Sequence, residues 1–122
     1  MANTVTRKGN EILVTITETG AGSGTEETIT LGVQKFRVFR QLCQLTSGSG
    51  STVDPILARS SGGSGIDVLL ENDTAAATCD NQVTGGVICY SSSGVVYHKS
   101  VPNSGSDNAI STEYSILVGW GD

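Results

Sequence analysis

The amino-acid sequence predicts an all-β protein, an antiparallel β-sandwich or small barrel of about eight strands joined by long Gly/Ser-rich loops. Three observations support this fold class. Apolar residues recur with a period of two rather than 3.6, turn-forming residues return every ~8–12 residues, and the chain holds 16 Gly but only 2 Pro in 122 residues. Disordered chains carry more charge or Pro and fewer β-branched runs, so we expect a folded domain.

The first half of the chain contains three segments with alternating apolar residues, at 11–19, 26–31 and 33–47. The Gly/Ser-rich stretch between the first two predicts a hairpin with a long loop. In the third segment the alternation slips near Phe39, and a β-bulge is the simplest cause of such a slip. A short helical turn at the same place is the competing interpretation.

The second half contains further expected strands, at 56–58, 66–72, 87–90, 95–99 and 111–120. The third and fourth of these flank Ser-Ser-Ser-Gly and predict a hairpin, because Gly94 can supply the positive φ of a tight turn. The segment 74–83 fits neither a strand nor a loop clearly.

The core is expected to consist mainly of Val, Ile and Leu, because aromatic residues make up only 5% of the chain. Phe36, Phe39 and Trp120 are its largest expected members. A chain of this length has the size of one domain, which buries about two thirds of the surface of the unfolded chain. We therefore predict a single domain over residues 1–122, in which residues 1–10 can form an extended N-terminal arm.

The net charge is −5 and the isoelectric point is near 4.6. This charge argues against a nucleic-acid partner, because phosphates require a cationic surface, and against binding to an anionic membrane. The first 20 residues lack the apolar region of a signal peptide, and no stretch approaches the ~18 apolar residues of a membrane span. We expect the protein to be made and folded in a cytosol.

Three cysteines are present, Cys43, Cys79 and Cys89. An odd number without a secretion signal argues against a disulfide framework. A bridge between Cys79 and Cys89 across the expected hairpin is the alternative.

Residues that could carry catalysis or bind a metal are few and scattered. The only histidine, His98, lies in an expected strand, and no Ser stands in a Gly-x-Ser-x-Gly elbow. Zinc sites need close pairs such as Cys-x2-Cys, and the acids and amides of 71–81 match no calcium loop. We therefore predict no enzyme activity, no cofactor and no metal, and expect His98 at a strand surface or interface.

Gly/Ser-rich segments recur at 20–24, 47–51, 60–65, 91–94 and 104–106. Ordinary turns are one interpretation, and arms that order against neighbouring subunits are the other. Residues 100–112, SVPNSGSDNAIST, raise the question most clearly because they combine turn formers with small polar side chains. Small residues let backbone groups approach a partner closely, which suits a fairly polar interface.

The order of several segments resembles small virion proteins of tailed bacteriophages, above all head decoration or cement proteins. These segments are LTSGSGSTVDPILA at 45–58, VICYSSSGVVYHKSVPNSGSDNAIS at 87–111 and YSILVGW at 114–120. The loop PNSGSDN at 102–108 is the most similar part. The resemblance rests on composition and order and contains no diagnostic motif.

The resemblance implies a β-sandwich that binds the major capsid protein on the outer surface of the virion and stabilises the shell. It also implies a homo-oligomer, with a trimer favoured, that assembles in the host cytoplasm. The expected partner interface comprises Lys35, Arg37, Arg40, Pro102, Asn103, Asp107 and Asn108. The three cations would meet carboxylates of a partner or a neighbouring subunit.

Two alternatives remain open. The chain can be another phage structural part, such as a tail or fibre module. It can also be a small carbohydrate- or ligand-binding β-sandwich, in which aromatic residues form a platform for stacking on a sugar. The candidates for that platform are Tyr90, Tyr97, Tyr114 and Trp120.

Overall fold

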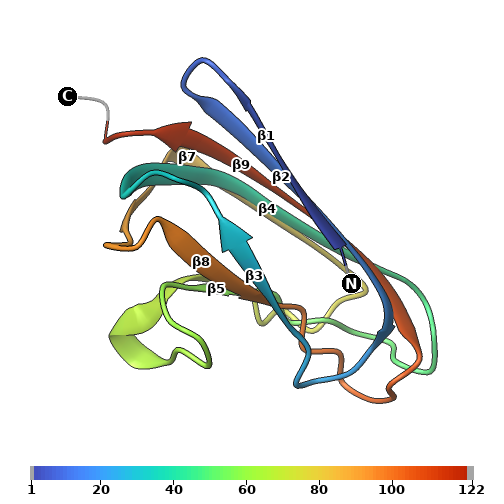
Figure 1. Ribbon diagram of the computed structural model, residues 1–122. Coiled ribbons are helices and arrows are strands. Elements are labelled where there is room, and N and C mark those ends of the chain that lie inside the picture. Colours follow the sequence, from blue (N-terminus) through green and yellow to red (C-terminus); the bar gives the residue numbers. More distant parts are fainter. Residues whose placement is uncertain (1, 121–122) are drawn as a thin grey trace.

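The computed structural model describes residues 2–120, which form two antiparallel sheets packed face to face (Figure 1). Sheet A has the strand order β1-β2-β9-β4-β7, and sheet B has the order β3-β8-β5-β6. The strands are β1 (Ala2–Lys8), β2 (Glu11–Ala21), β3 (Glu26–Thr30), β4 (Lys35–Ser47), β5 (Ile56–Ala58), β6 (Val68–Glu71), β7 (Thr78–Tyr90), β8 (Val95–Lys99) and β9 (Asn108–Val118). The prediction of an all-β sandwich is confirmed.

No α-helix occurs in residues 2–120, where a single 3-10 turn, η1 (Gly65–Asp67), precedes β6. No helix in this part of the chain is long and apolar enough to cross a membrane.

The strand order is that of a jelly roll with β1 added at one edge. When β1 is set aside and the remaining eight strands, β2 to β9, are counted from one to eight, sheet A has the order 1-8-3-6 and sheet B has the order 2-7-4-5. This arrangement is the double Greek key of jelly-roll proteins. The chain therefore crosses repeatedly from one sheet to the other.

Both predicted hairpins are wrong, because their two strands lie in different sheets. β2 belongs to sheet A and β3 to sheet B, and the same is true of β7 and β8. The Ser-Ser-Ser-Gly turn does form with Gly94 at φ +70°, but Gly94 O accepts hydrogen bonds from Leu31 N and Gly32 N, at 2.8 and 3.1 Å. Alternation of apolar residues shows which side of a strand is buried, and it does not show which strand is the neighbour.

The core lies between the sheets and combines the inward side chains of both. Its main cluster comprises Ile12, Val14, Ile16, Ile29, Leu31, Phe36, Val38, Leu57, Cys89, Val96, Tyr114 and Ile116. Each large aliphatic side chain buried there contributes about 1.5–3 kcal/mol to folding. Tyr114 and Phe36 are the largest side chains that are fully buried.

Phe39 and Trp120 do not belong to this core, which corrects the prediction. The predicted bulge is present as a register shift between Val38 and Arg40. It turns Phe39 to the outer side of sheet A, where it lines a surface groove. Trp120 follows β9 and keeps 39% of its surface exposed.

Residues 2–8 form β1, the edge strand that pairs along its whole length with β2. Residues 2–8 therefore do not form the expected extended arm, because they belong to sheet A as its edge strand. Asn3 Nδ2 also donates to Glu27 Oε1 and to Thr28 O, the latter at 3.1 Å, so that β1 is tied to β3 of the other sheet.

The outer surfaces of the two sheets differ. The connection between β5 and β6 crosses the outside of sheet B and reaches β3, where Glu26 accepts hydrogen bonds from Ser61 Oγ and Gly62 N. Figure 1 shows this connection below the β8 and β5 strands. No segment of residues 2–120 crosses the outside of sheet A, so this face is open.

Candidate functional site

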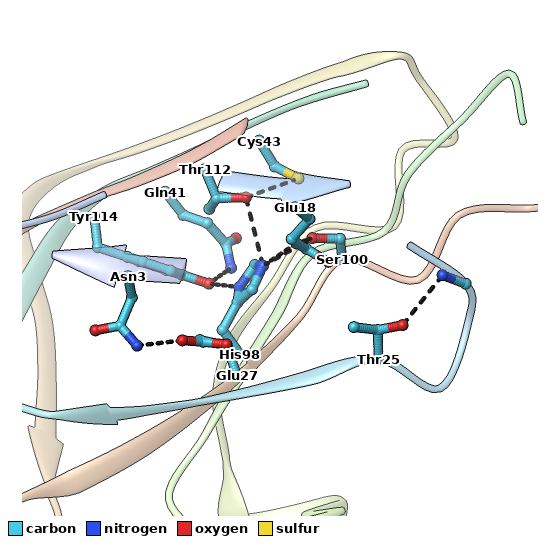
Figure 2. A network of polar contacts seen from close by, with 11 residues as sticks. Asn3, Glu18, Thr25, Glu27, Gln41, Cys43, His98, Ser100, Thr112 and Tyr114 are labelled. Carbon is cyan, nitrogen blue, oxygen red and sulfur yellow. Dashed lines mark hydrogen bonds and ion pairs between the residues drawn. The ribbon is translucent and has the colours of Figure 1, made fainter. Parts of the chain in front are cut away.

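A group of buried polar side chains lies between the sheets around His98 (Figure 2). Gln41 Nε2 donates to Tyr114 Oη at 2.9 Å, and Tyr114 Oη lies 2.6 Å from His98 Nδ1. His98 Nε2 lies 2.8 Å from Ser100 Oγ, which donates to Glu18 Oε1. None of these side chains exposes more than 1% of its surface.

Two hydrogen bonds at the ends of the network have a fixed donor, Gln41 to Tyr114 and Ser100 to Glu18. Their directions decide which atom carries the proton in the two bonds of His98 between them. Tyr114 Oη accepts from Gln41, and because burial raises the pKa of Tyr114, the hydroxyl keeps its proton and donates it to His98 Nδ1. His98 Nε2 then donates to Ser100 Oγ, and Ser100 donates to Glu18. The result is a chain of donors that runs in one direction and ends on the buried side chain of Glu18.

This network has the residue types of a catalytic triad, but it has no access for a substrate. Ser100 and His98 are each only 1% exposed, and the side chains around them belong to the core. Chains of hydrogen bonds in a low-dielectric interior strengthen one another and fix a unique packing. The network joins the two sheets, although Glu18 Oε2 and Gln41 Oε1 have no hydrogen-bond partner among residues 2–120. The expectation that His98 lies at a surface or interface is wrong, because β8 points it inward.

The outer side of sheet A is the candidate interaction site, which we call the open face. Exposed or partly exposed apolar side chains lie along it, namely Leu13 of β2, Phe39 of β4, Ile88 of β7 and Leu117 of β9. Leu13 is 43% exposed and Ile88 is 65% exposed. A shallow groove of about 480 Å³ runs between Leu13, Phe39 and Leu117. Exposed apolar patches on soluble proteins commonly mark interaction sites.

The three cations predicted for the interface, Lys35, Arg37 and Arg40, all lie on β4 on this same side. Arg40 forms a bidentate pair with Asp80 at 2.9 Å, which raises the pKa of Arg40 and lowers the pKa of Asp80. Arg40 is thus occupied within the chain. Arg37 stacks on Phe39, with its guanidinium carbon 5.2 Å from the ring centroid.

The other four residues predicted for the interface, Pro102, Asn103, Asp107 and Asn108, lie together at one end of the sandwich. This end is opposite to the one at which Lys35 begins β4. This end is formed by residues 22–25, 48–55, 72–77 and 100–107, which we call the distal loops. Pro102 and Asn108 are buried. Asn103 and Asp107 are exposed, but their side chains accept hydrogen bonds from backbone N–H groups of residues 49–52. The structure does not bring these residues next to the β4 cations.

The segment 100–112 therefore has a role within the chain. Asn108 Oδ1 accepts from Gly50 N at 2.9 Å, and Asn108 Nδ2 donates to Ala21 O and Ser104 O at 2.9 and 3.0 Å. Three loops are joined through this one buried side chain. Sequence analysis missed this clamp because Asn is also an ordinary turn residue.

Replacing Asn108 by Ala is expected to lower the free energy of unfolding by about 3 kcal/mol, because buried backbone groups lose their partners. Asn103→Ala is the matched control, since Asn103 is exposed and water can replace its contacts. Urea denaturation measures both changes. Equal losses for the two variants would contradict the role assigned to Asn108.

The three cysteines are free thiols and are buried. Cys79 and Cys89 lie ten positions apart on the same strand, β7, so the alternative bridge between them is not formed. Cys43 faces Cys79 across β4 and β7. In residues 2–120 no three His, Cys, Asp or Glu side chains gather as a metal site.

Burial raises the pKa of Cys43 and of Cys89 to about 11. At pH 8 only about one such thiol in a thousand is ionised, and the thiolate is the reactive form. We expect the native protein to react with a disulfide reagent at under about 1% of the rate of the urea-unfolded protein. Absorbance of the released thiol measures both rates. Fast reaction of one native thiol would show that its strand opens locally.

The aromatic side chains proposed as a sugar platform do not gather. Tyr114 is buried between the sheets, and Tyr97 lies on β8 of sheet B. Tyr90 and Trp120 both lie beside Lys35. Tyr90 of β7 pairs in register with Lys35 of β4, and the Nζ atom of Lys35 lies 4.9 Å from the centroid of the Trp120 ring.

Comparison of the chain with protein-family models gives no match, and no curated protein matches it.

Proposed function

We propose that this protein is a virion structural protein that binds the outer surface of a phage capsid as a decoration protein. In this role it forms a homo-oligomer, with a trimer favoured by the resemblance, and stabilises the shell through contacts with the major capsid protein. The observation that carries the proposal is the open face of sheet A. The connection between β5 and β6 crosses part of the outer side of sheet B, and sheet A presents apolar side chains to solvent.

The jelly-roll topology supports the same proposal, because this fold recurs in capsid proteins as well as in lectins. Fold alone does not establish function. The open face adds an exposed surface on which apolar and cationic side chains lie side by side, with Arg37 between Leu117 and Ile88 in register. Aromatic residues, apolar residues and Arg are common in protein–protein interfaces. Several copies bound to one shell would multiply modest contacts through avidity.

Binding to the shell is tested by cosedimentation with empty shells of the major capsid protein encoded nearest to this gene. We expect the wild-type chain to sediment with the shells, and Leu13→Asp to bind at least tenfold more weakly because a charge then enters the apolar centre of the contact. Thr30→Asp is the control, since it adds the same charge to the exposed outer side of sheet B. A wild-type chain that stays in the supernatant, or that sediments only with tails, would overturn the capsid assignment.

Carbohydrate binding is the second candidate function, because Tyr90 and Trp120 are exposed by 40% and 39% at one corner. Lys35 Nζ lies 4.9 Å from the centroid of the Trp120 ring, so one face of the indole is already in contact with a cation. Trp120 is the only Trp, so its fluorescence reports this corner without ambiguity. We expect no spectral shift on titration with a panel of monosaccharides at 50 mM, roughly ten times a weak lectin constant. A saturable shift would favour the lectin function.

A further inference from the structure

One end of the molecule carries an excess of acidic residues. The distal loops contain Asp54, Asp73 and Asp107, Glu71 directly precedes them, and none of these loops contains Lys or Arg. Hydrogen bonds and bridges join the loops into one surface: Asn72 N donates to Pro55 O at 3.1 Å, and Val53 bridges to both Ala76 and Pro102. Lys99 directly precedes 100–107 and lies level with Glu71 in sheet B, because both pair with Ile56. This end is therefore acidic overall but holds one cation, and its other exposed residues are mostly Gly, Ser, Ala and Thr.

The opposite end carries a cationic and aromatic corner. Lys35 and Arg37, at the start of β4, lie beside Ile88 and Tyr90 of β7. Arg59 Nη1 donates to Tyr90 O at 2.8 Å, which adds a third cation, although Arg59 Nε also lies 3.8 Å from Asp67 Oδ1 in an ion pair within the chain. We call Lys35, Arg37, Arg59, Ile88, Tyr90 and Trp120 the basic corner. It is separated from the distal loops by the 13 residues of β4, which span about 40 Å.

The basic corner has the features of an incomplete contact. Ile88 is 65% exposed, which is costly for an aliphatic side chain. Arg37 Nη1 donates to Gly85 O at 3.3 Å, and its Nε, which has no hydrogen-bond partner among residues 2–120, is covered by the chain itself. A partner that covers Ile88 would remove its apolar surface from water, and carboxylates of that partner would pair with the charges of Lys35 and Arg37. The distal loops of a second copy supply carboxylates on small-residue loops, whose backbone can come near a partner.

We propose that copies of this chain associate head to tail, with the distal loops of one copy seated on the basic corner of the next. The occupant of the corner is thus a second copy. Such a contact is heterologous, and repetition closes it into a ring or extends it into a filament according to the rotation between copies. The inference names how the subunits of the proposed virion protein meet. Complementary charge sets the register of the contact and excludes pairing of like ends.

Charge reversal tests the contact, with sedimentation velocity of the full chain as the measurement. The corner variant is Lys35→Glu with Arg37→Glu, and the loop variant is Glu71→Lys with Asp73→Lys. The structure gives Glu71 and Asp73 no side-chain hydrogen bonds, so the loop variant leaves the fold intact. We expect wild-type oligomers at 100 µM, about the range of weak interfaces, and at least tenfold weaker association of each variant alone.

Two further samples make the test specific. A mixture of the two variants should associate again. The acidic corner of the corner variant then meets the basic loops of the loop variant, and the wild-type corner of the loop variant meets the wild-type loops of the corner variant. The variant with all four substitutions restores the wild-type net charge of −5 and should also associate. Raising the salt from 50 to 500 mM should weaken all these contacts through screening.

The proposal is overturned if the wild-type chain is a monomer, if the variants still associate, or if neither the mixture nor the fourfold variant recovers. Circular dichroism confirms that each variant is folded before it is compared. The outcome is separable from the proposed function: a monomer that binds shells refutes the head-to-tail contact alone. A chain that associates but ignores shells refutes the decoration function alone.

Discussion

Replacing Ser100 by Ala is expected to destabilise the protein by about 3–5 kcal/mol, a large part of the 5–15 kcal/mol typical of a domain. Ser100 Oγ takes a hydrogen bond from His98 Nε2 and gives one to Glu18. Without the hydroxyl, the Glu18 side chain, which is 1% exposed and whose Oε2 has no partner among residues 2–120, loses the donor to its Oε1. A buried polar group left without partners costs more than the hydrogen bond itself contributes.

A double-mutant cycle separates this electrostatic cost from lost packing. Glu18→Gln removes the charge and keeps the shape, so it should cost about 1 kcal/mol or less. Ser100→Ala made in the Glu18→Gln background should then cost at least 2 kcal/mol less than in the wild type. Equilibrium denaturation in urea gives all four free energies, provided that the slopes agree.

A small effect of Ser100→Ala would have a definite meaning. His98 Nε2 lies 3.5 Å from Glu18 Oε1, so a slight movement could replace the serine bridge by a direct bond. A loss under about 1 kcal/mol in the single variant would show that this bond forms and that the donor chain is not needed.

The fold class was predictable because it depends on a local pattern. Ile12, Val14 and Ile16 alternate with polar residues, and each is buried as the alternation requires. The bulge near Phe39 was predictable for the same reason, since one extra residue interrupts the alternation. Strand partners were not predictable, because the two hairpins assumed from short connections are crossings between the sheets.

The candidate sites were predictable only in part. The β4 cations were singled out from sequence, and the structure places them on the open face, although Arg40 is paired within the chain. The buried network was not predictable, because Glu18, His98 and Ser100 come from segments far apart in sequence. A weak signal was available: Glu18 and His98 both occupy inward positions of alternating strands, where a charged or ionisable residue needs a partner.

The packing of the segment 100–112 within the chain could not be predicted from its composition. Gly105 and Asn108 of this segment pack against Ser49 and Gly48 of the neighbouring loop. The Gly residues are required by close approach of the backbone, a property that depends on the folded arrangement of three loops. An interface at this end can use the exposed Asn103 and Asp107, and it cannot use the buried side chain of Asn108.

Replacing Gly48 by Ala is expected to cost about 3 kcal/mol or more and to disorder the distal loops. Gly48 adopts φ +121°, and a Cβ atom added there would lie 2.6 Å from the Cα and 2.5 Å from the Oδ1 of Asn108. The clash with Cα involves backbone, so no side-chain rotation relieves it. Asn108 must move, and its hydrogen bonds to Gly50, Ala21 and Ser104 weaken together.

Gly62→Ala separates the clash from the backbone strain that any L-residue suffers at positive φ. Gly62 has φ +65° and nothing within 4 Å of an added Cβ, so this variant should lose only the strain, about 1–2 kcal/mol. Amide hydrogen exchange then locates the damage, because Gly48→Ala should deprotect Gly50 N and Ser49 N while β1 and β2 stay protected. If both variants lose the same stability, the loops yield easily and the clamp through Asn108 is not a fixed part of the fold. If Gly48→Ala is much the worse, the loops are rigid before any partner arrives, and the acidic end is preorganised for a contact with another copy.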